Sequence, residues 1–477
     1  MNPRVAIVIV NWNKKDYILN LLRSLSSLHY DNYEIIVVDN ASTDSSVEAI
    51  RQQHSSVHLI INPENLGGTG GFNTGMRYAL VKGDYKYIWL LDNDAEVEKE
   101  TLRELVNAIE TDNTIGIAGS RIMSPENREL IVELGGFVDW DSVTWRPHLR
   151  YLNEKDYSGY NVIETDYVAT CSALVRKEVI KSLGLMDEKF FLHCDDIDFC
   201  LRLKKNGFKV VAVFSSKVFH SVEKGFIPQV LYYDYRNFLL LISKHLGGLR
   251  RFLSVIKLLK TSSESLLYFF FDKKIFESKL IFFALYDFCI NNFHKMTRNI
   301  KETSHPQKKD YINDREIQSA KNILILQNGA YEEVRKAILA VRKIAPNAHV
   351  HLLVHRDKKN LYGDTDVNQY ITFDLFKDST VQKAMLFLKL LLSNFRLGVS
   401  TDNPFLLPFV YCTRKNIVYD QKIDSFYIIE NNSYNLWKIV LSVFLGDFFA
   451  ILFLSPFFYL LSFKYAESQH QYYKKQV

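Results

Sequence analysis

Short apolar runs alternate with helix-type patterns through the first half of the chain. Val5–Val10 is rich in β-branched residues and predicts a buried strand, and Tyr33–Val38 and Val57–Ile61 predict two more. From Tyr17 to Leu28, apolar residues recur at helical spacing between the first two strands. Strands that alternate with helices are typical of an α/β fold with a parallel sheet. Ligands of such folds bind outside the carboxyl ends of the strands, so the residues that follow each strand are the first candidates for a site.

The next apolar run ends on Asp92-Asn93-Asp94. Side chains alternate along a strand, so Asp92 and Asp94 are expected to project to the same side. Two carboxylates aimed into one cleft repel each other unless a cation or hydrogen-bond donors satisfy them. The stretch therefore predicts a divalent-metal site that holds a diphosphate. The alternative is a strand end with turn chemistry and an Asp helix cap.

Polar residues and glycines follow the other strands. Asn11 ends the first strand, Asp39 ends the second, and the segment Asn65–Gly75 follows the third, with five glycines in nine positions. A glycine-rich turn that opens a helix, expected here at Met76–Lys82, presents backbone N–H groups to an anion. The segment matches neither the dinucleotide fingerprint nor a P-loop. A flexible surface loop is the alternative, but the position of the segment suggests one crevice for all these groups.

Three acids and one histidine lie further along the chain. Asp195, Asp196 and Asp198 begin a helix that is expected to end at Asn206-Gly207. The helix dipole favours their ionised form, and an ionised carboxylate can serve as a general base. Capping alone is the alternative. His220 ends a strand-like run, where it could be a third metal ligand or a purely structural histidine.

The region between these motifs is less regular. Ile115–Ala118 and Tyr167–Val175 predict strands. The loop between them carries Trp140, Trp145 and His148, whose rings could stack on a sugar or act as packing anchors.

Six segments stand in the order of a known family: Val8–Asn13, Val37–Asp44, Asn65–Asn73, Leu90–Asp94, Asp195–Asp198 and His220. With them the chain resembles the family 2 inverting glycosyltransferases, which have the GT-A fold. It is most similar to their rhamnosyl- and galactofuranosyltransferase branch, which acts in bacterial cell-surface polysaccharide assembly. The resemblance covers about residues 3–225.

The resemblance implies a role for each matching residue. Asp196 would be the base that deprotonates the acceptor hydroxyl. Asp195 is its rival, because the chain has Cys194-Asp195-Asp196 where the family often has Glu-Asp or Trp-Asp-Asp. Asp94 and His220 would ligate Mg²⁺ or Mn²⁺, and Asp92 would be shared between the metal and the ribose. The nucleotide sugar would contact Asn11, Asp39, Asn65, Gly67, Gly68, Gly70, Gly71, Asn73 and Asp92.

The implied reaction moves a sugar (rhamnose, galactofuranose or similar) from a nucleotide-diphosphate donor to a hydroxyl of a glycan or lipid-linked glycan. Inverting transfer is a single in-line displacement, which needs one base and stabilisation of charge on the leaving diphosphate. A polyprenyl-phosphate glycosyltransferase is one alternative. A non-catalytic nucleotide-sugar-binding protein is another.

Length and pattern predict further parts beyond the first domain. We expect a GT-A domain at 1–230, an amphipathic helical region at 231–300 and a linker at 301–320. A small Rossmann-like α/β unit is expected at 321–430, and a hydrophobic membrane-associated segment at 436–464. The elements expected in the small unit are Ile323–Leu326, Glu332–Ile344, His349–Val354, Val381–Leu392 and Ile417–Tyr419.

Several features favour a membrane surface as a partner. Ile439–Phe463 is long enough to cross a bilayer, although Asp447 and Pro456 leave a spanning helix, a re-entrant hairpin, an interfacial helix and a buried core helix open. Arg250–Lys260 and Lys279–Phe293 are basic and amphipathic, and could lie on a membrane or pack on the first domain.

The composition is consistent with the cytoplasmic face of a bacterial inner membrane. The net charge of +5 is too modest to argue for nucleic acid, but it suits an anionic membrane surface. The five cysteines form no CxxC pair, which favours a reducing compartment.

Overall fold

The structure is a computed structural model of the chain. It describes residues 2–150, 152–157, 161–220, 228–271, 274–298, 300, 310–326 and 331–356, and parts of 359–429. The described residues fall into two compact units, divided between Lys301 and Glu302.

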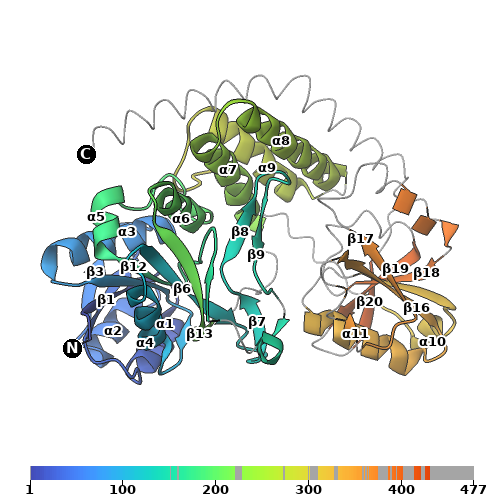
Figure 1. Cartoon of the computed structure of the whole chain (residues 1–477). Coiled ribbons are helices and arrows are strands. Elements are labelled where there is room, and N and C mark those ends of the chain that lie inside the picture. The colour runs from blue at the N-terminus through green and yellow to red at the C-terminus, as the bar shows by residue number, and fades with distance from the viewer. Residues whose placement is uncertain are drawn as a thin grey trace. The chain divides into compact units, whose positions relative to one another are not determined.

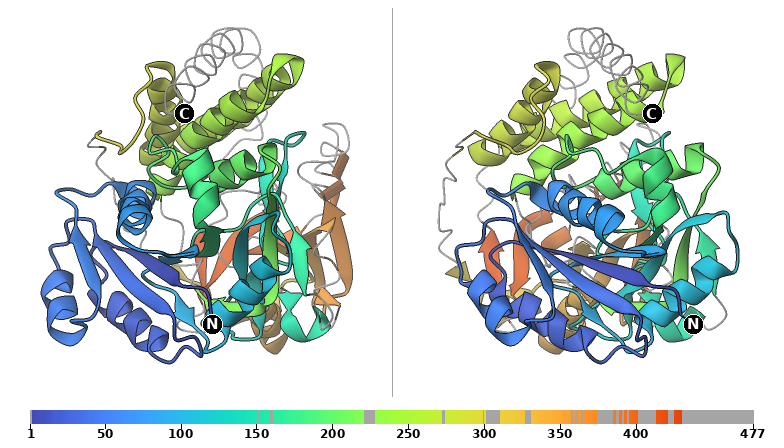
Figure 2. Two further views of the ribbon diagram at one scale, coloured as in Figure 1. Left: turned by 60° about the vertical axis from the view of Figure 1, so that its left-hand side comes forward. Right: turned by 90° about the vertical axis from the view of Figure 1, so that its left-hand side faces the viewer.

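The first unit is built on a mixed sheet (Figures 1 and 2). The expected parallel pairing holds for β1 to β4, which lie in the order β3-β2-β1-β4. Beyond β4 the sheet turns antiparallel, because β12 runs against both β4 and β6. The strands are β1 Val5–Asn11, β2 Tyr33–Asp39, β3 His58–Ile61, β4 Tyr87–Asp92, β5 Glu96–Val97, β6 Ile115–Met123, β7 Leu130–Glu133, β10 Leu152–Asn153, β11 Val162–Glu164, β12 Ser172–Arg176 and β13 Lys209–Phe219, with a separate pair β8 Gly136–Asp139 and β9 Thr144–Pro147.

Two hydrophobic cores cover the two faces of this sheet. Side chains of β1 alternate between them, since Ala6 and Val8 belong to one core and Ile7 and Ile9 to the other. The helices of the Ile7 core are α1 Lys15–Leu25, α2 Ser46–Gln53 and α4 Thr101–Glu110. The helices of the Val8 core are α3 Gly67–Lys82, α5 Lys177–Leu183, α6 Asp195–Lys205, α7 Pro228–His245, α8 Gly248–Phe271 and α9 Ile275–Cys289.

The glycine-rich segment is helical, which corrects the expected loop. Helix α3 begins at Gly67, nine residues before the expected start at Met76. The glycines let the helix approach the sheet closely. A Cβ atom on Gly71 would lie 2.5 Å from Val10, and one on Gly75 would lie 2.2 Å from Val8.

Replacing Gly75 by Ala is expected to destabilise the protein by about 1–3 kcal/mol, because the new methyl group overlaps a stiff, buried valine. Gly68 is the matched control in the same helix, since a Cβ there would meet no atom within 4 Å. Gly68→Ala should raise stability by roughly 0.5–1 kcal/mol. Urea denaturation of both variants checks this, and equal midpoints would contradict the close-packing explanation.

The strand expected at Tyr167–Val175 is shorter than expected. Only Ser172–Arg176 is a strand, β12. The chain turns just before it, where the Ser172 amide donates to the Ala169 carbonyl at 3.3 Å, and Tyr167 makes only an isolated bridge to Gly136.

Helices α7, α8 and α9 lie together beside α6 in Figure 1. Leu239 and Leu240 of α7 and Leu259 of α8 are fully buried in the same core as Phe199 of α6. The structure therefore shows the packing of this region against the first domain, which was one of its two expected arrangements.

The second unit has a seven-stranded sheet in the order β14-β20-β19-β18-β15-β16-β17. Its expected strands and its first expected helix are present. The helix expected at Val381–Leu392 lies largely outside the described residues, as does all of Ile439–Phe463. No helix in the described ranges has the length and apolarity needed to span a bilayer. The elements are β14 Asp310–Tyr311, α10 Asp314–Gln318, β15 Asn322–Leu326, α11 Tyr331–Ile344, β16 His349–His355, β17 Gln369–Phe373, β18 Phe395–Ser400, β19 Thr413–Asp420 and β20 Ser425–Ile429.

Candidate active site

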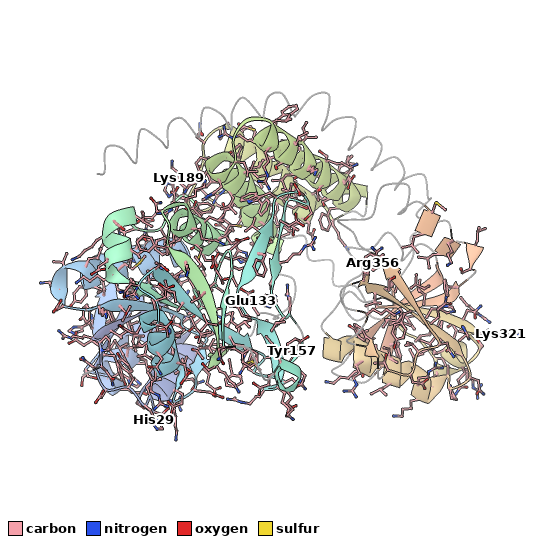
Figure 3. The ribbon with its side chains drawn as sticks, viewed as in Figure 1. His29, Glu133, Tyr157, Lys189, Lys321 and Arg356 are labelled. Carbon is pink, nitrogen blue, oxygen red and sulfur yellow. The ribbon has the colours of Figure 1, made fainter. Side chains whose placement is uncertain are left out.

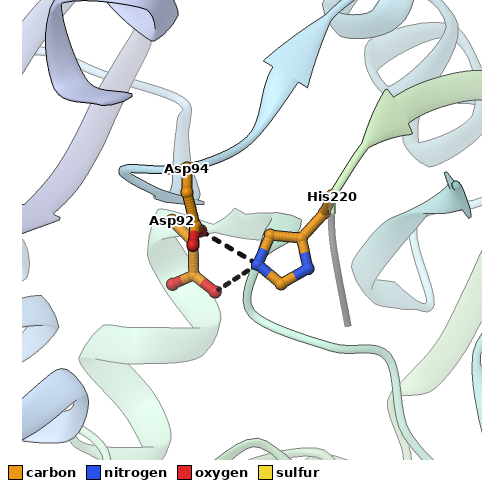
Figure 4. A group of neighbouring side chains, drawn as sticks. All are labelled: Asp92, Asp94 and His220. Carbon is orange, nitrogen blue, oxygen red and sulfur yellow. Dashed lines mark ion pairs between the residues drawn. The ribbon is translucent and has the colours of Figure 1, made fainter. Parts of the chain in front are cut away.

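Asp92, Asp94 and His220 meet where two distant strands end. Asp92 is the last residue of β4, and His220 directly follows β13. Nε2 of His220 lies 3.0 Å from Oδ1 of Asp94 and 3.6 Å from Oδ2 of Asp92. One ring nitrogen faces both carboxyl groups, and the other points away from them (Figure 4). One ligand atom from each residue lies within 4.8 Å of the other two, which is close enough for one metal ion.

The charges of this cluster are tightly coupled. Nζ of Lys14 lies 2.9 Å from Oδ2 of Asp94. Burial alone would raise the pKa of Asp94, but His220 and Lys14 outweigh it and hold that pKa well below its usual range. Burial raises the pKa of Asp92 to about 6, even though His220 opposes this. Burial would lower the pKa of His220, and the two carboxylates raise it instead.

The donor set fits a divalent cation. Two carboxylate oxygens and one imidazole nitrogen suit Mn²⁺, and the carboxylates also suit Mg²⁺. The side chains of Asp92, Asp94 and His220 keep 38%, 19% and 16% of their surface exposed. A substrate or water can therefore supply the remaining ligands.

Asn11 and Asp39 are linked to the turn that carries Asp92 and Asp94. The side-chain amide nitrogen of Asn11 donates to Oδ2 of Asp39 at 2.9 Å, and that of Asn93 donates to Oδ1 of Asn11 at 2.8 Å. The backbone N–H of Ser42 donates to Oδ1 of Asp39 at 2.7 Å. Asn11 and Asp39 are fully buried, so this network fixes the end of β1 and β2 against the turn that carries Asp94.

The start of α3 joins the acids of α6. Oγ1 of Thr69 donates to Oδ2 of Asp195 at 2.7 Å, and the Gly67 amide donates to Oδ1 of Asn65 at 2.8 Å. Asn73, a predicted nucleotide-sugar contact, is buried instead, and its amide group exchanges two hydrogen bonds with the backbone of Met186.

The three acids at the start of α6 have different surroundings. Asp195 is buried against Thr69, whereas Asp196 stays partly exposed. Burial and then the charge of Asp195 raise the pKa of Asp196 to about 7. Asp198 is fully buried and paired with Arg202, Lys244 and His245, so it is a structural charge.

Trp140 and Trp145 act as packing anchors. Their ring centroids lie 6.4 Å and 5.3 Å from that of Phe238 in α7.

Glu133 is an acid whose charge interacts with that of Asp196, and the sequence analysis did not single it out. It ends β7, and Figure 3 labels it beside the strands β7 to β9. Burial raises its pKa to about 8, and the charge of Asp196 raises it further, while Arg150 and His220 oppose the change. Its Oε1 atom is buried, and no described residue donates to it. No local motif marks Glu133, because the residues around it lie far away in the sequence.

Fold and site together define an α/β domain with acids and a histidine gathered at the carboxyl ends of its strands. Residues 6–184 match the family model described as Glycosyl transferase family 2, so this stretch is a glycosyl transferase family 2 domain, and its sheet is mixed.

The proteins similar to the chain include two curated relatives and one solved structure. The low-salt glycan biosynthesis hexosyltransferase Agl10 of Haloferax volcanii is 26% identical over 208 residues, 43% of this chain and 63% of Agl10. The dTDP-rhamnosyl transferase RfbF of Shigella flexneri is 27% identical over 262 residues, 51% of this chain and 82% of RfbF. A mannosyltransferase from Pyrobaculum calidifontis, in complex with GDP-Man and Mn²⁺, has 17% identity and a TM-score of 0.39, covering 60% of this chain and 75% of its own.

Proposed function

We propose that the chain is a metal-dependent inverting glycosyltransferase of glycan or polysaccharide biosynthesis. The observation that carries the proposal is the meeting of Asp92, Asp94 and His220 at the strand ends of the first unit, which contains a glycosyl transferase family 2 domain. The donor would be a nucleotide-diphosphate sugar, and the acceptor a hydroxyl of a glycan or lipid-linked glycan.

The residues of the cluster would hold the metal and the donor. Asp94 and His220 are the proposed ligands of Mg²⁺ or Mn²⁺, and Asp92 is shared between the metal and the ribose. Such an ion, when bound, stabilises negative charge on a leaving diphosphate. Asn11 and Asp39 are fully buried, so they would fix the strand ends that carry the cluster and would not themselves touch the nucleoside.

Asp196 is the proposed base. Asp198 is engaged in buried ion pairs and Asp195 accepts from Thr69, which leaves Asp196 as the partly exposed acid of the three. Asp196 would take the proton of the acceptor hydroxyl as its oxygen bonds to the anomeric carbon. The bond from that carbon to the diphosphate oxygen breaks in the same step, which inverts the configuration.

The donor sugar is proposed to be rhamnose, galactofuranose or a similar sugar. The name of RfbF supports this choice, since RfbF is a dTDP-rhamnosyl transferase. The cytoplasmic face of a bacterial inner membrane is the proposed location, supported by the apolar sequence of Ile439–Phe463.

A donor screen tests the proposed function. The full chain is incubated with Mn²⁺ and a panel of UDP-, dTDP- and GDP-sugars, and the released nucleoside diphosphate is measured. We expect release from at least one donor and none in EDTA. Release from no donor, with the protein shown to be folded, would overturn the proposal.

Turnover is expected to rise with pH and to level off above about pH 7. Asp196 must be ionised to accept a proton, and its pKa is raised to about 7 by burial and by Asp195, so the active form is lost as the pH falls below that value. Initial rates between pH 5 and 9 at saturating donor check this. A rate that stays constant from pH 5 to 8 contradicts the role of Asp196.

A further inference from the structure

The segment that leads into α6 has a strained backbone. Phe191, His193 and Cys194 have φ angles of +65°, +63° and +63°. Residues with side chains rarely adopt this left-handed conformation, because Cβ crowds the backbone. Such strain persists only where the surrounding structure enforces it, and it is found most often at functional sites. The next two residues are Asp195 and Asp196.

The side chain of Asn237 in α7 holds this segment from one side. Its amide nitrogen lies 3.0 Å from the carbonyl oxygen of Phe190, 2.7 Å from that of Leu192 and 2.9 Å from that of His193. Asn237 is fully buried, so the carbonyls of Leu192 and His193 would lose this donor if the side-chain amide were removed.

Arg236, the neighbour of Asn237, extends the same contact. Its guanidinium donates to the carbonyls of Lys189 and Phe190 at 3.1 Å and 3.0 Å, and to that of His294 at 2.8 Å. Arg236 is also fully buried. Two consecutive residues of α7 therefore bind the backbone from Lys189 to His193.

The start of α3 holds the same segment from the other side. The Thr69 amide donates to the Phe191 carbonyl at 3.3 Å, and the Thr69 hydroxyl donates to Asp195. Gly67 has a φ of +73°, and a Cβ there would lie 2.2 Å from the Phe191 carbonyl oxygen. The segment before α6 is thus fixed between α3 and α7.

We propose that Asn237, supported by Arg236, is a positioning residue that sets the place of Asp196 for proton abstraction. This rests on the proposed function. Helix α7 lies outside the matched residues 6–184, as Asp196 itself does, and through Asn237 it would complete the proposed active site. Asn237 touches only the backbone of the segment, so it acts through Asp196.

The test compares Asn237→Ala with Ser243→Ala in the full chain. Ser243 is a buried residue of α7 whose hydroxyl bonds only within its own helix, to the Leu239 carbonyl. Hydrogen exchange is followed in peptides that cover residues 186–200. Mn²⁺-dependent release of nucleoside diphosphate is followed with the donor that the wild type turns over fastest.

For Asn237→Ala we expect faster exchange in 186–200 and unchanged exchange in β1 and β4. We also expect kcat to fall by about 10²-fold, with an unchanged KM for the donor, because a displacement near 1 Å is enough for such a loss. Ser243→Ala should match the wild type in hydrogen exchange and in kcat. If Asn237→Ala does not fold, Asn237→Ser, which keeps one donor, should show the same changes to a smaller extent.

Two results would overturn the proposal. Exchange in 186–200 that does not change shows that Asn237 does not hold the segment, whatever the enzyme does. Faster exchange with an unchanged kcat shows that the segment does not set the base. A wild type that releases no nucleoside diphosphate instead refutes the proposed function, and with it a role for Asn237 in positioning a base.

Discussion

Asp196→Asn is expected to lower glycosyl transfer by about 10²–10⁴-fold, the usual contribution of a general base. The amide keeps the size of the side chain, and it can still accept the hydrogen bond that Oδ1 receives from the Ile197 amide at 2.8 Å. It cannot take the proton of an acceptor hydroxyl. Initial rates at saturating donor and Mn²⁺ measure the effect, and the donor KM should stay close to that of the wild type.

Asp195→Asn is the matched control for this prediction. Its new amide oxygen can still accept from the Thr69 hydroxyl, so the start of α6 should keep its place. We expect this variant to retain most of its activity. If Asp195→Asn is inactive and Asp196→Asn is active, the base is Asp195, the alternative that the sequence Cys194-Asp195-Asp196 allowed.

Asp94→Asn is expected to lower turnover by roughly 10³-fold and to weaken Mn²⁺ binding. His220 and Lys14 keep the carboxyl group of Asp94 ionised, and the variant removes this negative charge from the cluster. A metal ion stabilises the leaving group by several kcal/mol, and each 1.36 kcal/mol is a factor of about ten in rate. Turnover and Mn²⁺ titrations of the same preparation check both effects.

Asp16→Asn is the control for Asp94→Asn. Asp16 is an exposed acid in the first turn of α1, two residues from Lys14, so its replacement makes the same change of charge nearby. It should leave turnover and Mn²⁺ affinity almost unchanged. An equal loss in both variants would mean that the overall charge matters and that Asp94 has no special place.

The strand ends of the site could be predicted from sequence because their signals are local. The β-branched run of β1 stops at Asn11, and that of β2 stops at Asp39. The run of β4 stops at Asp92. Parallel pairing then brings Asn11 and Asp39 level with each other in the sheet, as observed.

The glycine-rich segment misled the prediction because glycine has two uses. Propensity favours a loop, since glycine disfavours helices. Here the close approach of α3 to β1 decides the outcome, because Gly71 and Gly75 sit where Val10 and Val8 leave no room for a side chain. That competition depends on tertiary packing, which no local pattern reports.

Glu133 and Asn237 could not be found from sequence because their partners are distant. Asn237 binds carbonyls 44 to 47 positions away, and neither residue belongs to a recognisable motif. The amphipathic pattern of Arg250–Lys260 and Lys279–Phe293 was equally compatible with a membrane surface and with the packing observed, since burial on one face gives the same periodicity in both cases.

Binding of nucleoside diphosphates to the full chain tests the metal–diphosphate site most directly. Calorimetric titrations with UDP, dTDP and GDP are made in Mn²⁺ and in EDTA. We expect one of the three to bind at least about tenfold more tightly in Mn²⁺, a difference of about 1.4 kcal/mol, and Asp94→Asn to remove that difference. Equal affinity in Mn²⁺ and in EDTA, or binding of none of the three, would contradict the assignment of Asp92, Asp94 and His220.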